Sequence, residues 1–424
     1  MNKEKILMVC YYYPPLKDVG VKRSVAFSEY LSSYTPVVLT VSNPDRLYCS
    51  VGDPLLENTV EVHRARNMFN CTAIVGKLDA VIEKLCEFIF RKKKLKYRYA
   101  YNFLCIPDHF VFWVPAAFYN ARKIIKKNKI KIIYISCTPH SAALIGVLLK
   151  LMYGDKVKLI VDYRDPFYIS DFALMIPGFR RGINKWFQKL ILEKSDRVIF
   201  TTNSILDVYI DEYPTYYKKY CVIQNGVDVK GVKVVSSPQK YSKFTLIYAG
   251  NFYLDSLSYD GLFAAISSLK KKGIIAEENF CFRFYGEEFK EIQCLAERNN
   301  LDDLVVARER VGFESIVNIL QRSHAQLLRI YAPMLSTKLF EGIYLNTPFL
   351  AQTESLESIE IIRKYSPNSE IVGFDDSAEI EKGLYLLIIK QRQGGGSDND
   401  ISDFLCKFSR EALTKKLESI IMSM

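Results

Sequence analysis

Several features that define common functional classes are missing from the sequence. The ten cysteines include no C-x-x-C pair and the four histidines are scattered, so neither residue type shows a metal-ligand spacing. The longest apolar stretch, roughly residues 141–153, contains Lys150 and is too short to span a bilayer. No helix-turn-helix, zinc-finger, RRM or KH pattern is present, which argues against a nucleic-acid partner. Together with an apolar first strand at residues 6–10 in place of a signal peptide, these absences predict a reduced cytoplasmic protein.

Positive charge, by contrast, is abundant in the first half of the chain. Residues 1–230 hold 35 Lys and Arg against 21 Asp and Glu, a balance of +14, whereas the remainder has a balance of −3. A run of cations lies beside aromatic residues: Arg91, Lys92, Lys93, Lys94, Lys96 and Arg98. This run is compatible with a solvated helix end, but with the basic half it favours docking on an anionic membrane surface. We therefore expect a peripheral protein at the inner face of the cytoplasmic membrane.

The apolar pattern predicts two successive sets of alternating strands and helices. Continuous apolar runs such as residues 132–136 are typical of parallel strands that are buried on both faces. The pattern restarts at residues 244–249, after a Ser- and Pro-containing linker. This order predicts an α/β protein with two doubly wound, Rossmann-like domains facing across a cleft, at residues 1–230 and 231–403.

Residues 336–351 read as a loop, a helix, a turn and an apolar strand. Ser336 or Thr337 can cap the helix, whose free N–H groups and positive dipole end would suit a phosphate. Lys338 lies in the first turn, where a cation opposes the dipole, and a bound diphosphate would explain its presence. Glu341 follows on the same face, within reach of a sugar hydroxyl of the same ligand. From the spacing alone, an ordinary surface Lys–Glu pair is the favoured interpretation.

Other candidates follow strands of the first half. Gly20 lies between the first strand and its helix, where doubly wound folds bind phosphates, although a plain turn would also use it. His140 follows a strand and would lie in the ligand crevice, or bond within its own turn. Asp162, Arg164 and Asp165 end another strand and can form either a structural ion-pair network or a functional one.

The string Thr337-Lys338-Leu339-Phe340-Glu341, before Thr-Pro and an apolar strand, resembles the donor-site motif of GT-B glycosyltransferases of the family 4 type. The resemblance covers nearly the whole chain, with motifs in the family's order. The other matching strings are Tyr11-x-Pro-Pro with Gly20-x-x-Arg23, Thr138-Pro-His140-Ser, Asp162-x-Arg164-Asp165-Pro and Asn225-Gly-Val-Asp228. Residues 404–424 resemble the C-terminal helix that returns to the first domain in GT-B proteins.

This resemblance implies a retaining, metal-independent hexosyltransferase that uses a nucleotide diphosphate sugar as substrate, UDP rather than GDP, and no cofactor. It places Lys338 on the diphosphate, Glu341 on the ribose hydroxyls and His140 near the reacting sugar. The further donor-binding residues would be Gly20, Arg23, Gly250, Asn251, Gly286, Ser336 and Thr337, and the acceptor-side residues Asp162, Arg164 and Asp165. With the basic first half, we expect a lipid-linked saccharide acceptor in surface polysaccharide assembly.

Two departures from the family pattern keep alternatives open. Pro333 occupies a position where relatives often carry glutamate, and Phe252-Tyr253-Leu254 offers no cation behind Gly250. A non-catalytic GT-B binding subunit of a membrane complex would tolerate both departures. A nucleotide-sugar epimerase or hydrolase could share the fold and would turn over the donor without an acceptor.

Overall fold

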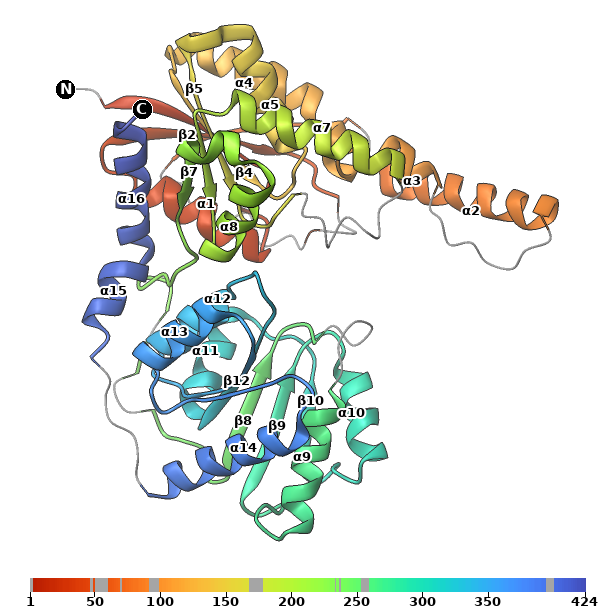
Figure 1. The fold of residues 1–424 in the computed structure, drawn as a ribbon, viewed down its shortest axis with the longest axis vertical. Helices are drawn as coiled ribbons and strands as arrows, with labels where there is room; N and C mark the ends of the chain where they lie inside the picture. Colours follow the sequence, from red (N-terminus) through yellow and green to blue (C-terminus); the bar gives the residue numbers. More distant parts are fainter. Residues whose placement is uncertain are drawn as a thin grey trace. The chain divides into compact units, whose positions relative to one another are not determined.

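The computed structural model of the chain describes residues 3–45, 49, 60–68, 71–90, 99–167, 178–232, 234–235, 238–252, 259–393 and 400–424. The basic run at residues 91–98 lies outside the described residues. The chain divides into two compact units (Figure 1): Met1–Gln224 with Leu413–Met424, and Asn225–Ala412. Each unit is described by itself.

The N-terminal unit is built on a parallel seven-stranded sheet in the order β3-β2-β1-β4-β5-β6-β7. Its strands are β1 (Glu4–Cys10), β2 (Tyr34–Val41), β3 (Glu61–Ala65), β4 (Ile132–Cys137), β5 (Lys158–Tyr163), β6 (Arg197–Phe200) and β7 (Tyr220–Val222). All six residues of β4 are buried, as expected for an aliphatic strand with helices on both faces. The strand order reverses between β1 and β4, and ligands of doubly wound sheets bind at the carboxyl ends of such a strand pair.

The helices of this unit alternate with its strands and bury the sheet. They are α1 (Val19–Tyr30), α2 (Cys71–Phe90), α3 (Tyr99–Leu104), α4 (Val114–Asn128), α5 (Ala142–Tyr153), α7 (Gly178–Lys194) and α8 (Asn203–Glu212). Three short 3-10 turns complete it: η1 (His109–Trp113), η2 (Gly154–Lys156) and η3 (Pro214–Lys219). Among the described residues, no helix combines the length and the apolar character needed to cross a membrane.

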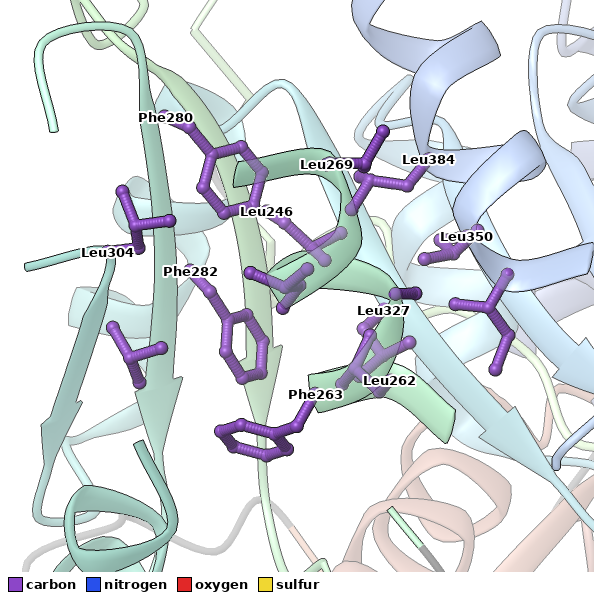
Figure 2. Packing of buried hydrophobic residues seen from close by; sticks show 14 of the residues in the cluster. Leu246, Leu262, Phe263, Leu269, Phe280, Phe282, Leu304, Leu327, Leu350 and Leu384 are labelled. Carbon is purple, nitrogen blue, oxygen red and sulfur yellow. The ribbon is translucent and has the colours of Figure 1, made fainter. Parts of the chain in front are cut away.

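The second unit repeats this architecture on a six-stranded parallel sheet in the order β10-β9-β8-β11-β12-β13. Its strands are β8 (Phe244–Ala249), β9 (Phe280–Tyr285), β10 (Val305–Arg308), β11 (Ala325–Ile330), β12 (Phe349–Thr353) and β13 (Glu370–Val372). Its helices are α9 (Asp260–Lys271), α10 (Phe289–Arg298), α11 (Phe313–Arg322), α12 (Thr337–Tyr344), α13 (Leu356–Tyr365) and α14 (Ser377–Arg392). Figure 2 shows part of one core, where Leu262 and Leu269 of α9 pack beside Leu246 and Leu327 of the sheet. The prediction of two doubly wound α/β domains is confirmed.

The single predicted C-terminal helix is instead two helices, α15 (Ser402–Phe408) and α16 (Arg410–Met422). The break is at Ser409, whose extended backbone forms a parallel bridge with Val227. This pairing satisfies backbone groups on both sides of the break: Val227 N–H donates to Phe408 O at 3.0 Å, and Arg410 N–H donates to Val227 O at 2.9 Å. In α16, Glu418 accepts bonds from the backbone N–H groups of Ser32 and Ser33, which fixes this helix to the N-terminal unit.

One further expectation from the sequence requires correction. Gly20 and Arg23, expected in the loop after β1, lie inside α1, because the helix already begins at Val19 behind an extended Asp18.

Candidate functional site

The carboxyl edge of the second sheet brings together three segments predicted to bind the donor. Gly250 and Asn251 follow β8, Gly286 follows β9, and α12 begins close behind β11. Since β8 and β11 are the neighbouring strands at which the order reverses, this edge is the expected ligand site of the unit.

Of the two predicted caps of helix α12, Ser336 and Thr337, Ser336 is the cap in the structure. The Ser336 Oγ accepts a hydrogen bond from Lys338 N–H at 3.3 Å, and Thr337 is the first helical residue. Further along, Gly342 lets the helix approach the sheet, because a Cβ there would overlap the ring of Phe349 and lie 2.8 Å from Gln326 Oε1. This packing fixes the position and direction of the first turn.

Lys338 extends from that first turn toward the end of β8. Its Nζ lies 4.5 Å from the ring centroid of Tyr248, a cation–π distance. A Cβ placed on Gly250 would be only 2.5 Å from the same Nζ, and the φ of Gly250 is 124°, which favours glycine. Burial of the ammonium group lowers the pKa of Lys338 to about 8; Glu341 opposes the shift, and the positive charge of Arg310 adds to it.

Gly250 and Gly286, which follow β8 and β9, allow the backbone of these two segments to approach closely. A Cβ on Gly286 would overlap the carbonyl oxygen of Gly250 and come within 2.6 Å of the Phe284 ring. Next to them, Phe252 is buried, and its backbone N–H donates to Glu288 Oε2 at 2.5 Å. Phe252, two residues behind Gly250, therefore belongs to the core, which is a physical reason why this position is apolar here and not a cation.

Arg310 is a candidate that the sequence analysis did not single out. It follows β10 at the same carboxyl edge, it is exposed, and its charge acts on Lys338. Arg310 Nη1 lies 4.0 Å from Glu287 Oε1, a distance at which an exposed pair is weak. The available signal was its place just after the short apolar stretch that forms β10, because doubly wound folds collect ligand contacts at strand ends.

In the N-terminal unit, Gly20 lies against Arg164. A Cβ on Gly20 would overlap the guanidinium group, so only glycine leaves room for this arginine. Arg164 donates to the backbone carbonyls of Cys137 and Thr138, and its guanidinium lies 5.2 Å from the Tyr12 ring centroid. The structure thus brings the first loop together with the ends of β4 and β5.

His140 and Asp165 lie at this same edge. The Oγ1 of Thr138 donates to Asp165 Oδ2 at 2.7 Å, which ties the two loops together. The His140 ring stacks obliquely on Phe167 at 4.7 Å between centroids, and its Nδ1 is buried without a hydrogen-bond partner. Burial lowers the pKa of His140, against the opposing charges of Asp108 and Asp165, so the imidazole is neutral at physiological pH.

Arg23 and Asp162 are not placed as expected. Both are buried, and the Arg23 Nε donates to Asp162 Oδ2 at 2.7 Å while Nη2 donates to Oδ1 at 3.0 Å. Arg23 also donates to Gln224 O at 2.9 Å, and Tyr134 Oη donates to Asp162. The expected phosphate contact and acceptor-side carboxylate are thus one internal ion pair, formed because each buried charge needs a partner.

The two parallel sheets with these carboxyl-edge sites define the GT-B fold, and comparison with solved structures confirms it. Sucrose-phosphate synthase from Thermosynechococcus elongatus has a TM-score of 0.66 at 13% identity, with 99% of each chain covered. Anabaena Alr3699/HepE in complex with UDP-glucose has a TM-score of 0.62 at 12% identity, with coverage of 99% of this chain and 100% of that chain. A putative UDP-N-acetylglucosamine 2-epimerase from Listeria monocytogenes has a TM-score of 0.57 at 11% identity, with coverage of 99% and 96%.

At the level of sequence, residues 90–230 match the family model described as Glycosyltransferase Family 4. No curated protein matches the chain. The predicted resemblance to GT-B glycosyltransferases of the family 4 type is confirmed by this match and by the fold. Together, the family match and the fold support a glycosyltransferase activity for the chain.

Proposed function

We propose that the chain is a retaining, metal-independent glycosyltransferase. It moves a sugar from a nucleotide diphosphate donor, UDP rather than GDP, to a lipid-linked saccharide in surface polysaccharide assembly. The acceptor and the anionic membrane surface are inferred from the basic first half of the chain and the run at residues 91–98. The UDP preference is supported by the fold shared with a protein solved in complex with UDP-glucose.

The observation that carries the proposal is the environment of Lys338. Its ammonium group lies in the first turn of a helix and near the charge of Arg310, and burial lowers its pKa to about 8. Each of these effects disfavours a cation, and the negative charge of a bound diphosphate would compensate for them. The same anion would lie at the N-terminus of α12, where the positive end of the helix dipole favours negative charge.

This arrangement suits the departure of a nucleotide diphosphate. In glycosyl transfer the bond from the anomeric carbon to the diphosphate oxygen breaks, a bond to an acceptor hydroxyl forms, and negative charge accumulates on the leaving group. Lys338 and the helix N–H groups would stabilise that charge. Glu341, one turn further on, would hold the ribose hydroxyls, and neutral His140 with Arg164 and Asp165 would serve the sugar and acceptor side.

The test is calorimetric titration with UDP, GDP and ADP. We expect micromolar binding of UDP, weakened at least tenfold, or about 1.4 kcal/mol, in both Lys338→Ala and Glu341→Ala. Lys382→Ala, which removes an exposed lysine from α14, is the matched control and should bind like the unchanged protein. Failure of all three nucleotides to bind would contradict the donor site and favour the non-catalytic binding subunit.

The remaining alternative is a nucleotide-sugar epimerase or hydrolase, which is supported by the fold shared with a putative epimerase. Turnover of the UDP-sugar with and without an acceptor distinguishes it from a glycosyltransferase. A glycosyltransferase consumes the UDP-sugar quickly only when a lipid-linked acceptor is added. An epimerase or hydrolase consumes it at the same rate with no acceptor, and that result would refute the proposed transfer.

A further inference from the structure

An apolar groove lies among three helices of the N-terminal unit and includes none of the predicted site residues. Its volume is about 460 Å³, and it is lined by Leu78 and Ile82 of α2, Phe103 and Leu104 of α3, and Phe179 of α7, among others. The volume is in the range of ligand pockets. Asn102 is the one polar residue of the described lining, and its Oδ1 already accepts a hydrogen bond from Arg180 Nη1 at 3.0 Å, so this lining does not offer the convergent polar groups that orient a polar metabolite. The groove therefore suits a hydrocarbon.

Buried charges hold the walls of the groove in place. Asp79 of α2 accepts hydrogen bonds from the N–H groups of Ala100 at 2.6 Å and Tyr101 at 3.3 Å, at the start of α3. Arg180 of α7 donates to the carbonyls of Cys105 at 2.8 Å and Pro107 at 2.9 Å, just beyond the end of α3. The carboxylate at the N-terminus and the cation near the C-terminus both match the helix dipole, so α3 is fixed between its neighbours.

The outer faces of these helices are also apolar. Large hydrophobic residues at intervals of three and four form one stripe per helix and are exposed: Ile74, Leu78, Val81 and Leu85 on α2, and Phe179, Ile183 and Trp186 on α7. Such a stripe normally faces a core, yet Trp186 is 59% exposed and Phe103 of α3 is 72% exposed. In the N-terminal unit, α2 extends away from the sheet, with α3 and the start of α7 near its base (Figure 1). We call this surface the α2–α3–α7 face.

Charge indicates what covers the face. By sequence, residues 71–104 carry a formal charge of +5 and residues 178–194 a charge of +4, out of +11 for the whole chain. Lys77, Lys84, Lys185 and Lys189 are exposed on α2 and α7. A second copy of the chain would bring the same positive charge to this face, which disfavours self-association. Lysines beside an apolar stripe with an exposed tryptophan are instead typical of helices that lie in a lipid interface.

We propose that the α2–α3–α7 face inserts into the surface of an anionic phospholipid bilayer and that the groove takes one hydrocarbon chain of a lipid. The inference deepens the proposed function, on which it rests for the membrane-bound acceptor, but it does not depend on the donor chemistry. It adds a second membrane contact, at the apolar groove, to the one proposed for the basic run at residues 91–98.

The chain offers a built-in reporter of this insertion, because it has two tryptophans and Trp113 is fully buried. With vesicles of phosphatidylcholine and phosphatidylglycerol, the protein should co-sediment and the emission of Trp186 should shift to shorter wavelength. Vesicles of phosphatidylcholine alone should give neither effect. Trp186→Phe should keep binding, since Phe is apolar, and lose the shift.

Substitutions on the face complete the test. Phe103→Glu with Ile183→Glu should lower the partition onto anionic vesicles at least tenfold, and the neutral pair Phe103→Ser with Ile183→Ser should lower it in the same direction. Leu356→Glu, at a position 76% exposed on α13, is the matched control and should bind vesicles normally. All variants should keep the unfolding temperature and UDP affinity of the unchanged protein, which separates this proposal from the donor site.

Three results would overturn the proposal. The first is vesicle binding that the face variants do not weaken. The second is equal binding to neutral and anionic vesicles, or none to either. The third is lipid-free self-association that shifts the Trp186 emission, seen in sedimentation velocity, which would assign the face to a second copy of the chain.

Discussion

The two units surround the cations of their predicted motifs, Arg23 and Lys338, in different ways. In the N-terminal unit, Arg23 is buried and both of its hydrogen bonds to Asp162 are 3.0 Å or shorter. In the C-terminal unit, Lys338 extends over the Tyr248 ring toward the backbone at Gly250, and burial lowers its pKa to about 8. The first charge is neutralised inside the protein, whereas the second is held where its charged form is disfavoured.

Under the proposed function, this difference separates a structural charge, Arg23, from a binding charge, Lys338. Both cations lie near the start of a helix that follows a strand at a switch point: Arg23 is the fifth residue of α1 and Lys338 the second of α12, so their sequence contexts are similar. What distinguishes them is that Arg23 forms a direct, hydrogen-bonded ion pair with Asp162, whereas Glu341 and Glu288 only partly offset the burial of Lys338. The following predictions test that distinction.

The largest effect is expected from breaking the internal pair. Asp162→Ala leaves Arg23 charged and buried and removes the acceptor of Tyr134, so the free energy of unfolding should fall by about 3–5 kcal/mol. Chemical denaturation followed by circular dichroism measures this loss. At temperatures where the variant is folded, its affinity for UDP should be unchanged, because the pair is structural.

Replacing the whole network provides the control. Arg23→Met with Asp162→Leu and Tyr134→Phe removes both charges and the Tyr134 hydroxyl together, and its remaining cost is the loss of the Arg23 hydrogen bond to Gln224 O. It should therefore recover most of the lost stability. Unchanged stability of Asp162→Ala, or a loss of UDP affinity in the folded variant, would contradict the structural assignment.

A smaller effect, on UDP binding, is expected where Lys338 approaches Gly250. Gly250→Ala places a methyl group 2.5 Å from Lys338 Nζ at a φ of 124°, so the lysine must move. We expect UDP affinity to fall about thirtyfold to a hundredfold, or roughly 2–3 kcal/mol, in calorimetric titration.

Gly273→Ala is the matched control for backbone strain. Gly273 also has a positive φ, of 68°, but a Cβ there would have nothing within 4 Å. Both variants should lose about 1 kcal/mol of stability, and only Gly250→Ala should lose UDP affinity. Equal UDP affinities of the two variants would show that the approach of Lys338 to Gly250 does not matter for binding.

Local patterns sufficed to predict much of this fold. The aliphatic runs of β1 and β4 and the cap at Ser336 were predicted because strand burial and helix capping depend on neighbouring residues. The break at Ser409 was not, because it results from pairing with Val227, far away in the sequence. The residues on both sides of Ser409 show a continuous helical pattern when they are considered alone, so the sequence predicts a single helix there.

The same limit applies to the candidate sites. The Arg23–Asp162 pair joins residues 139 positions apart, so nothing near either residue indicates that the charge is already used. Arg310 acts on Lys338 because β10 ends and α12 begins at the same edge of the sheet. The α2–α3–α7 face was not predicted from the sequence, because the exposure of an apolar stripe depends on the other helices that pack around it.

The smallest effect concerns the pH dependence of UDP binding. With its pKa lowered to about 8, Lys338 is charged in the free protein below that pH and neutral above it. A diphosphate stabilises the charged form, so above pH 8 binding requires uptake of a proton, and UDP affinity should fall by up to tenfold per pH unit. Lys338→Arg keeps its charge across this range and should show no break near pH 8. An affinity of the unchanged protein that stays constant from pH 7 to about pH 9.5 would mean that Lys338 does not meet the diphosphate as a cation.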